Sequence, residues 1–376
     1  MPHNYDLIIL GGGISGLGVA RAAAERRIPA LVLEASELAS ATSNNTLRII
    51  HGGFRYLQKL QLPRVIRSLN DQTFTSTYFP DAVSPLPCLM PLRQFGLKSK
   101  VPVTAATLMY GATMKFARSP LPAPRVLSAR ALEQLAPQFA PLAPHGALCW
   151  HDLLMTDPLA IATQLSREVI AQNVTILQHT KAVSVTRTPR SYTVTTHTGE
   201  TFSARSVVNT LGPWIRSITL PESPQRTRSK WCLGFNITIS RQLHPTHAIA
   251  VESPDGRLFF AVPRGATTTI GTWYSPCNAP STNTLGTPLT ISPDDIKRFI
   301  TAWNTAWPTQ SISEGDVIAT DAGVLPMRCE GSSGPELYGA ELISTDNNYC
   351  EVLSTKYTTF RSQGRAVVAR LALPSS

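Results

Sequence analysis

The chain has 376 residues, of which 43% are hydrophobic and 15% charged, and its 34 Lys and Arg against 24 Asp and Glu give a formal net charge of +10. This length suffices for roughly two to three domain-sized units with large cores, and the hydrophobic share excludes intrinsic disorder. The 23 Gly and 30 Pro have no period, which excludes a fibrous repeat. Without a long apolar run or a cleavable leader pattern, the sequence predicts neither a membrane-spanning helix nor a signal peptide.

The cysteines and the positive residues exclude two further classes of protein. The 6 cysteines lie far apart, with no CxxC pair and no Cys/His cluster at zinc spacing. We therefore expect reduced thiols, no metal site and a cytoplasmic protein. The positive residues do not gather into a run and no nucleic-acid-binding motif is present, so we expect no nucleic-acid partner.

A dinucleotide-binding βαβ unit opens the chain. The apolar run 6–10 predicts a buried strand, small and apolar residues at helical spacing follow, and 30–33 predicts a second strand. Glycines between the first strand and the helix have the spacing G-x-G-x-x-G, which permits a tight turn and lets a pyrophosphate approach the backbone. An acidic residue after the second strand can accept hydrogen bonds from a ribose. The candidate cofactor-binding residues are Gly11, Gly13, Ile14, Ser15, Gly16, Glu34 and Ala35.

The spacing of this motif does not decide between FAD and NAD. The helix that starts there offers free N–H groups and a positive dipole end to phosphates of either dinucleotide. The motif lies at the extreme N-terminus, and no second G-x-G-x-x-G is present for a separate nicotinamide. This arrangement favours a single, tightly held flavin.

The segment after the second strand resembles a known family. Residues 38–58, LASATSNNTLRIIHGGFRYLQ, resemble the signature of the FAD-dependent glycerol-3-phosphate dehydrogenases, within the D-amino-acid-oxidase-like (DAO) flavoprotein superfamily. Further segments resemble motifs of this family and occur in the same order. They are VNTLGPW at 208–214, IGT at 270–272, GVLP at 323–326 and KYTTFR at 356–361. The resemblance covers nearly the whole chain.

The resemblance implies a fold and a division into domains. The fold class is α/β (α+β), with a Rossmann-like FAD-binding domain of the glutathione-reductase type and a discontinuous β-sheet substrate domain. The FAD-binding domain would comprise residues 1–85, 149–225 and 319–376, and the substrate or cap domain 86–148 and 226–318. The family's additional C-terminal helical domain would be absent. The implied further cofactor contacts are Thr42, Ser43, His51, Gly52, Gly53, Val183, Asn209, Gly212, Trp214, Gly323, Lys356, Tyr357 and Thr358.

The residue types agree with those implied roles. Thr42 and Ser43 are short hydroxyl donors just after the second strand, within reach of a pyrophosphate. Lys356 precedes a Thr-Thr pair that can cap a last predicted helix, roughly 358–371. A helix N-terminus and Lys356 close to the flavin would favour negative charge on its reduced ring.

The substrate side departs from the family's pattern. An arginine expected in the family falls on Leu325 here, and a second falls near Ala340. Each charge-assisted contact contributes about 1.5–3 kcal/mol, so these losses disfavour glycerol-3-phosphate as the substrate. Arg328 is a candidate replacement for one arginine. The candidate substrate-binding residues are Arg55, Tyr56, Asn236, Thr272, Leu325 and Arg328.

The expected reaction is hydride transfer to flavin N5 from a C–H bond on a hydroxyl-bearing or, less favoured, an amine-bearing carbon. Arg55, Lys356 and His51 are the catalytic candidates, and a quinone or oxygen would accept the electrons. Two alternatives stay open: a flavoenzyme that modifies a natural product or RNA, and a flavin-binding protein without turnover. The apolar stretch 101–115 is expected to be buried in the cap. Contact with the inner membrane face or with a partner is its alternative role.

Overall fold

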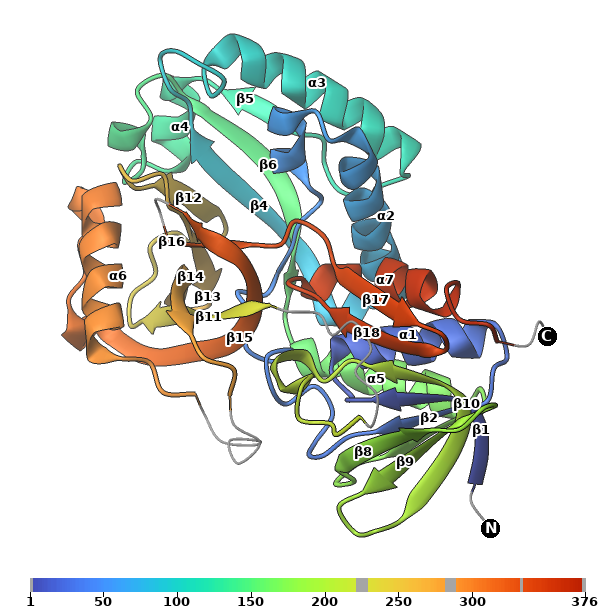
Figure 1. Ribbon diagram of the computed structural model, residues 1–376. Helices are drawn as coiled ribbons and strands as arrows, with labels where there is room; N and C mark the ends of the chain where they lie inside the picture. The colour runs from blue at the N-terminus through green and yellow to red at the C-terminus, as the bar shows by residue number, and fades with distance from the viewer. Residues whose placement is uncertain (1–2, 221–228, 281–288, 332–333, 374–376) are drawn as a thin grey trace.

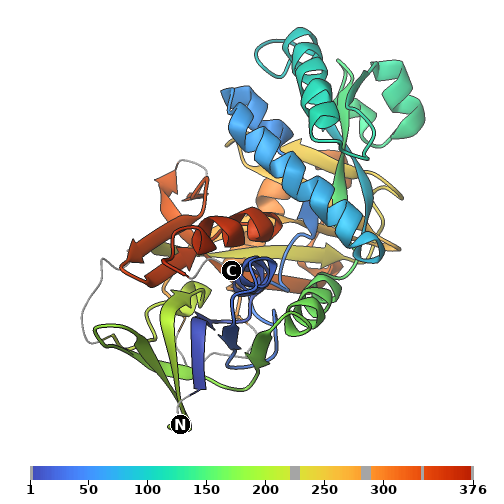
Figure 2. The same ribbon diagram turned by 90° about the vertical axis from the view of Figure 1, so that its right-hand side faces the viewer.

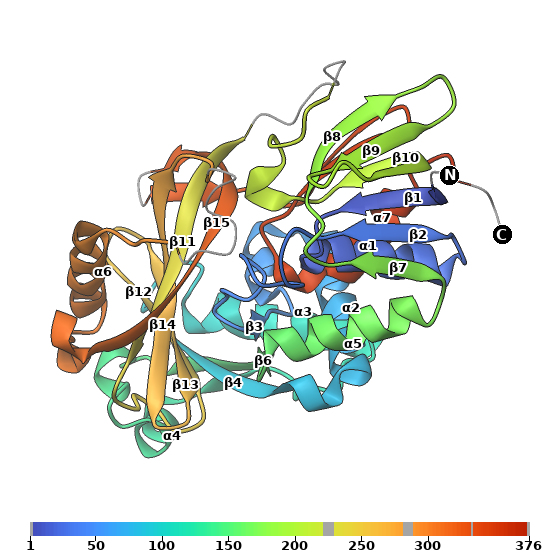
Figure 3. The ribbon, with the colours of Figure 1, turned by 90° about the horizontal axis from the view of Figure 1, so that it is seen from below.

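Two β-sheets lying side by side organise the molecule (Figures 1 and 3). The computed structural model describes residues 3–220, 229–280, 289–331 and 334–373. Within these ranges, no helix combines the length and the apolar character needed to cross a bilayer. All six cysteines are free thiols, and four of them are buried.

The first sheet contains the N-terminal strand. Its strands follow the order β17-β18-β10-β1-β2-β7, and the hairpin β8–β9 extends it from β10. The pairs β10–β1, β1–β2, β2–β7 and β10–β18 are parallel, as expected for strands covered on both faces. The strands are β1 (His3–Leu10), β2 (Ala30–Leu33), β7 (Val174–Leu177), β8 (Ala182–Arg187), β9 (Tyr192–Thr196), β10 (Thr201–Asn209), β17 (Leu342–Asp346) and β18 (Tyr349–Leu353).

The parallel pairing decides where the motifs meet. Strands β1, β2, β10 and β18 run in one direction, so their carboxyl ends lie at one edge of the sheet. Gly11, Glu34, Thr210 and Ser354 are the residues that directly follow these ends. Ligands of open α/β sheets bind outside this edge, so it is the expected cofactor position.

Helices from both ends of the chain pack against each other beside the first sheet (Figure 2). A Cβ added to Gly364 would lie 2.0 Å from the carbonyl oxygen of Gly18, and one added to Gly18 would lie 2.4 Å from that of Phe360. Glycine is therefore required on both sides of the crossing of the first and last helices. The helices of the chain are α1 (Ile14–Glu25), α2 (Leu62–Tyr78), α3 (Lys100–Phe116), α4 (Ala129–Leu135), α5 (Pro158–Ile170), α6 (Pro293–Ala306) and α7 (Phe360–Val368).

The second sheet has ten strands in the order β16-β15-β11-β14-β13-β12-β4-β6-β3, with β5 paired to β6. Helix α6 covers its outer side, where Phe299 and Trp303 pack against Phe235 and Phe259 of the sheet (Figure 3). The strands are β3 (Ile49–Ile50), β4 (Val83–Pro91), β5 (Arg125–Leu127), β6 (Ala147–Met155), β11 (Lys230–Ile239), β12 (Ala248–Glu252), β13 (Leu258–Arg264), β14 (Thr267–Cys277), β15 (Val317–Gly331) and β16 (Gly334–Leu337).

The α/β fold class is confirmed, and two predicted details are wrong. Helix α7 begins at Phe360, after a 3-10 turn over Tyr357–Thr359, and the Thr359 side chain makes no capping hydrogen bond. Stretch 101–115 forms helix α3, but only one of its faces is buried. The division into domains stays a prediction. Most of β15 and all of β16 fall in the segment 319–376, which this division assigns to the FAD-binding domain. They nevertheless belong to the second sheet.

We expect Gly364→Ala to destabilise the protein by about 1–3 kcal/mol, because the added methyl group meets the rigid backbone of α1. Urea unfolding measures the effect. The matched control is Gly111→Ala in α3, where no atom lies within 4 Å of the added Cβ. That variant should gain up to about 1 kcal/mol from helix propensity. Equal effects of the two substitutions would contradict the close crossing.

Candidate functional site

A cavity of about 1090 Å³ lies at the carboxyl edge of the first sheet and extends to the second sheet. Its volume reaches the upper end of the roughly 300–1,000 Å³ typical of small-molecule sites. Most of the residues predicted from the sequence line it. These are Gly11, Gly13, Ile14, Ser15, Glu34, Ala35, Thr42, Ser43, His51, Gly53, Arg55, Tyr56, Gly212, Trp214, Asn236, Thr272, Gly323, Leu325, Lys356, Tyr357 and Thr358.

Three other predicted residues lie behind the cavity wall and shape it. A Cβ on Gly16 would lie 1.9 Å from the carbonyl oxygen of Gly11, so this glycine permits the close packing of α1. Gly52 is buried, and a Cβ there would lie 2.1 Å from the Tyr110 hydroxyl. Asn209 is fully buried and fixes the following turn, because its Oδ1 accepts the N–H of residue 211 and its Nδ2 donates to the carbonyl of residue 215.

Two predicted residues do not face the cavity. The carbonyl of Val183 accepts a hydrogen bond from Thr219, while Lys181 and Ala182 line the wall at that position. Arg328 is exposed and pairs with a glutamate of the neighbouring strand β16. The structure therefore offers no support for Arg328 as a replacement for the missing arginine.

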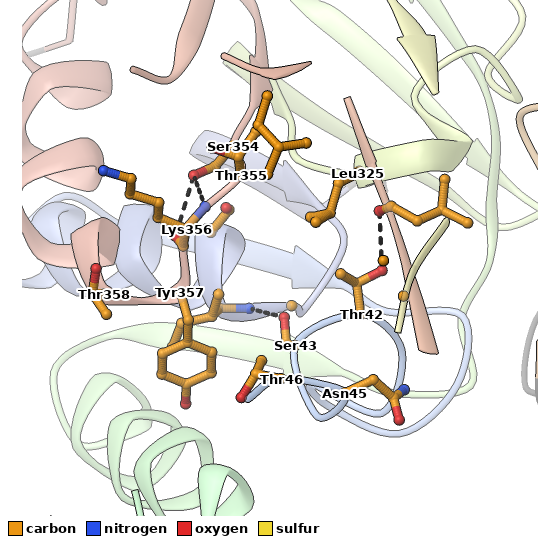
Figure 4. A pocket seen from close by; sticks show the side chains of 18 of the residues that line it. Thr42, Ser43, Asn45, Thr46, Leu325, Ser354, Thr355, Lys356, Tyr357 and Thr358 are labelled. Atoms are coloured by element: carbon orange, nitrogen blue, oxygen red, sulfur yellow. Dashed lines mark hydrogen bonds between the residues drawn. The ribbon is translucent and has the colours of Figure 1, made fainter. Parts of the chain in front are cut away.

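The end of β1 and the start of α1 fit a dinucleotide. Gly11 adopts φ +96°, which only glycine reaches without strain. The N–H of residue 12 donates to Oε2 of Glu34 at 2.6 Å, which fixes this carboxylate at the cavity wall. Ser43 accepts a hydrogen bond from the first N–H of α1 at 3.0 Å and thereby lies at the helix N-terminus, next to Thr42 (Figure 4). The positive helix end, the glycine backbone and Glu34 are the groups that pyrophosphate and ribose require.

His51 forms a pair with a buried carboxylate. Its Nδ1 lies 3.1 Å from Oδ2 of Asp152 on β6, and half of the His51 side chain is exposed to the cavity. The ring packs against Phe260, with centroids 5.8 Å apart. The carboxylate accepts Nδ1–H, which leaves Nε2 of the neutral ring as the hydrogen-bond acceptor.

Asp152 is the most highly hydrogen-bonded group of the site. Burial alone would raise its pKa, but hydrogen bonds from His51, from the N–H of Gly52 at 2.8 Å and from Nε1 of Trp150 at 2.9 Å outweigh burial and hold the pKa below its usual value. Nε2 of Gln72 also lies 3.3 Å away. The carboxylate is therefore ionised at neutral pH and orients the imidazole.

Arg55 and Lys356 are among the cations that line the cavity where the substrate side begins. Nζ of Lys356 lies 4.4 Å from the ring centroid of Tyr56, and burial together with the nearby charge of Arg55 lowers the pKa of this lysine to about 8. Arg55 itself belongs to the 3-10 turn Phe54–Lys59. Among the residues that the structure describes, no carboxylate pairs with Arg55 or Lys356. This part of the cavity therefore favours an anion.

The second sheet supplies a mostly uncharged wall opposite these cations. Thr272 donates to Oδ1 of Asn236 at 2.9 Å, so these two predicted residues satisfy each other. Burial raises the pKa of Tyr274 to about 12, which keeps its phenol neutral. The side chains of Leu325 and Trp231 complete the wall with apolar surface.

The sequence did not reveal Asp152, although it is the partner of a predicted residue. It follows Trp150 in the apolar strand segment ALCWHDLLM, which matches no motif. An acidic residue in a strand with apolar neighbours on both faces was the available signal, since buried charges are normally paired. The described part of the chain contains no group of three or more His, Cys, Asp or Glu that could hold a metal ion.

A parallel sheet with a glycine cradle at its carboxyl edge, closed by a second sheet, is an arrangement that fits a dinucleotide-dependent oxidoreductase. The sequence matches the family described as FAD dependent oxidoreductase (DAO) over residues 6–345. The chain therefore belongs to this family, and FAD is its cofactor.

Individual relatives act on different substrates. Aerobic glycerol-3-phosphate dehydrogenase of Staphylococcus epidermidis is 25% identical over 386 residues, which cover 98% of this chain and 67% of that protein. The structure of glycerol-3-phosphate dehydrogenase from Bacillus halodurans complexed with FAD matches with a TM-score of 0.65 and 19% identity, over 99% of this chain and 66% of that one. Glycine oxidase from Geobacillus kaustophilus matches with a TM-score of 0.69 and 15% identity, over 99% and 97%. The chain thus spans about two thirds of the glycerol-3-phosphate dehydrogenases that it resembles.

We expect Asp152→Asn to lower the free energy of unfolding by about 1–3 kcal/mol at pH 7, because an amide N–H₂ would face the Trp150 and His51 donors. The folded-state pKa of Asp152 lies below its ordinary value of 3.8, so the carboxylate stabilises the fold above that pH. The difference from wild type should shrink as pH falls through the lowered pKa. Urea unfolding at pH 7 and near pH 3 measures this, with the exposed Glu200→Gln as control. A constant difference at both pH values would contradict the ionised state.

Proposed function

We propose that the protein oxidises a small anionic hydroxy compound, or less favourably an amino compound, by hydride transfer to FAD. The observation that carries the proposal is that a histidine oriented by a buried carboxylate borders the same cavity as Arg55 and Lys356, for which the described residues provide no carboxylate partner. FAD, when bound, would supply a ring that can take up a hydride. The chain's own residues would bind the anion, orient the reacting carbon and take the proton.

Arg55 and Lys356 are the proposed anion-binding groups. The guanidinium of Arg55 can donate two parallel hydrogen bonds to a carboxylate or phosphate, and Lys356 adds a point charge. Tyr56 lies beside Lys356 and holds its ammonium by a cation–π contact. Leu325 stands where a further cation would serve a phosphate dianion, so the site is better suited to a singly charged group such as a carboxylate.

His51 is the proposed base. Asp152 keeps Nδ1 protonated, so Nε2 can accept the proton of the substrate hydroxyl or amine while the hydride leaves the carbon that bears this group. The substrate then becomes a carbonyl or an imine, and the imidazolium that forms is stabilised by the Asp152 charge. Phe260 packs against this base, and Trp150 packs against Phe260.

The electron acceptor and the location also belong to the proposal. We infer that a quinone or oxygen reoxidises the flavin, and that the protein works in the cytoplasm or on the inner membrane face. The relatives act on glycerol-3-phosphate and on glycine by name, which leaves both CH–OH and CH–NH oxidation as candidate reactions.

Anaerobic mixing of the FAD-loaded protein with candidate substrates tests the function. We expect 2-hydroxy acids to bleach the flavin absorbance at lower concentrations than glycerol-3-phosphate, because Leu325 stands where the family's pattern has an anion-binding arginine. Bleaching by glycerol-3-phosphate at micromolar concentration would refute the inference from Leu325. If no hydroxy or amino compound bleaches the flavin, oxidation of a small molecule is refuted, and a binding role or the modification of a larger molecule takes its place.

The same assay tests the base. His51→Gln should slow flavin reduction by the substrate so identified at least about 100-fold, the usual minimum for loss of a general base. Flavin absorbance serves as control, because the variant must still bind FAD. Reduction at the wild-type rate would exclude His51 from proton transfer.

We expect substrate affinity to weaken as pH rises through about 8, where Lys356 loses its proton and its charge. Lys356→Met should raise KM at pH 7 by about 10- to 150-fold and remove this pH dependence, since a charge-assisted contact contributes about 1.5–3 kcal/mol. KM between pH 6 and 9.5 measures both effects. Lys181→Met, at the cavity wall near Glu34, is the matched control and should leave KM unchanged. A KM for wild type that stays constant through pH 8 would contradict the role of Lys356.

A further inference from the structure

Helix α3 carries two apolar faces. Val103, Tyr110 and Met114 are buried in the core that the helix shares with α2 and the second sheet. At 100° per residue, a second row falls on the opposite side of the helix. This row consists of Val101, Ala105, Leu108, Ala112 and Phe116, and all five side chains are exposed.

The degree of exposure is unusual for large apolar side chains. Val101 is 79% exposed, Leu108 73% and Phe116 76%. Phe95 and Leu97 in the loop just before the helix are 77% and 70% exposed. A surface helix normally turns polar residues to solvent, and a helix that is apolar all round is normally covered. We call the five large side chains of Phe95, Leu97, Val101, Leu108 and Phe116 the α3 surface.

The charge around the α3 surface has one sign. Residues 82–132 contain no Asp or Glu but seven Lys and Arg. Arg93 and Lys98 pair with Glu252. The remaining cations near the helix are Lys100 at its first residue and Lys115 and Arg118 at its end, all exposed and with no carboxylate partner among the described residues. A partner that covers the apolar row therefore meets positive charge at both ends.

We propose that the α3 surface docks on an anionic lipid bilayer, with its apolar row among the upper acyl chains and its cations on the headgroups. The helix forms the outer edge of the molecule at the end opposite the N-terminus (Figures 1 and 2), so it presents a ridge rather than a groove. Its 17 residues give an apolar ridge about 25 Å long. Apolar residues with flanking Lys and Arg are the composition of helices that lie in a bilayer interface.

A second copy of the chain fits this surface less well. Pairing two α3 surfaces would bring Lys100, Lys115 and Arg118 of one copy close to the same cations of the other, while the neighbouring Glu252 is already paired with Arg93 and Lys98. Like charges repel, whereas each Lys or Arg gains about 1 kcal/mol close to an anionic membrane. The charge therefore favours the lipid over self-association.

Vesicle co-sedimentation of the full-length, FAD-loaded protein tests the proposal. We expect at least ten-fold stronger association with vesicles of phosphatidylcholine containing one quarter phosphatidylglycerol than with phosphatidylcholine alone. Added salt should reduce the difference, because it screens exposed charges. Absence of binding to the anionic vesicles would overturn the proposal, whatever substrate the enzyme oxidises.

Paired variants locate the contact. Leu108→Ser combined with Phe116→Ser should lower the association constant at least ten-fold. Ile170→Ser, on a side chain 55% exposed at the end of α5, should leave it unchanged. Lys100→Gln and Lys115→Gln should each weaken binding about five-fold, and only on the anionic vesicles.

Two further results would overturn the proposal. One is vesicle binding by the double variant that equals wild type while its flavin absorbance and circular dichroism are native. The other is a dimer in light scattering that the double variant converts to monomer, which would assign the α3 surface to self-association.

Discussion

One buried carboxylate holds the substrate end of the cavity together. Asp152 lies on β6 of the second sheet. It accepts hydrogen bonds from His51 and Gly52, which follow β3, and from Gln72 of α2. A buried charge needs such partners, because its desolvation in an apolar surrounding is otherwise costly. The pairing therefore fixes the segment that follows β3, and α2 with it, against β6. The proposed base His51 is itself one of its partners.

Local patterns were enough to predict the elements and the cofactor. The run 6–10, the glycines after it and Glu34 are adjacent in sequence, so hydrophobic period and turn chemistry identify them directly. Each of these features depends on neighbours within one segment, which a single sequence displays.

Features that depend on contacts between distant segments were not predicted from the sequence. Asp152 gains its importance only because β6 runs behind Gly52, about a hundred positions earlier in the chain. Arg328 lies near Leu325 in sequence, but an extended strand turns neighbouring side chains to opposite faces, and Arg328 finds a glutamate on β16. The outward face of α3 was hidden for the same reason, since the stretch is apolar throughout and only the packing distinguishes its two sides.

The crossing of α1 and α7 has a consequence for biosynthesis. Gly18 and Gly364 touch although they are far apart in the sequence, and Gly11 and Lys356 border the same cavity. The cavity is thus unfinished until the segment that carries Lys356 has been synthesised. Long-range pairing of this kind slows folding. Until it forms, the glycine-rich turn after β1 is not covered by the later part of the chain. FAD binding at this cavity would consequently have to follow the docking of α7 on α1, and a supply of free FAD at that stage would favour the yield of native protein.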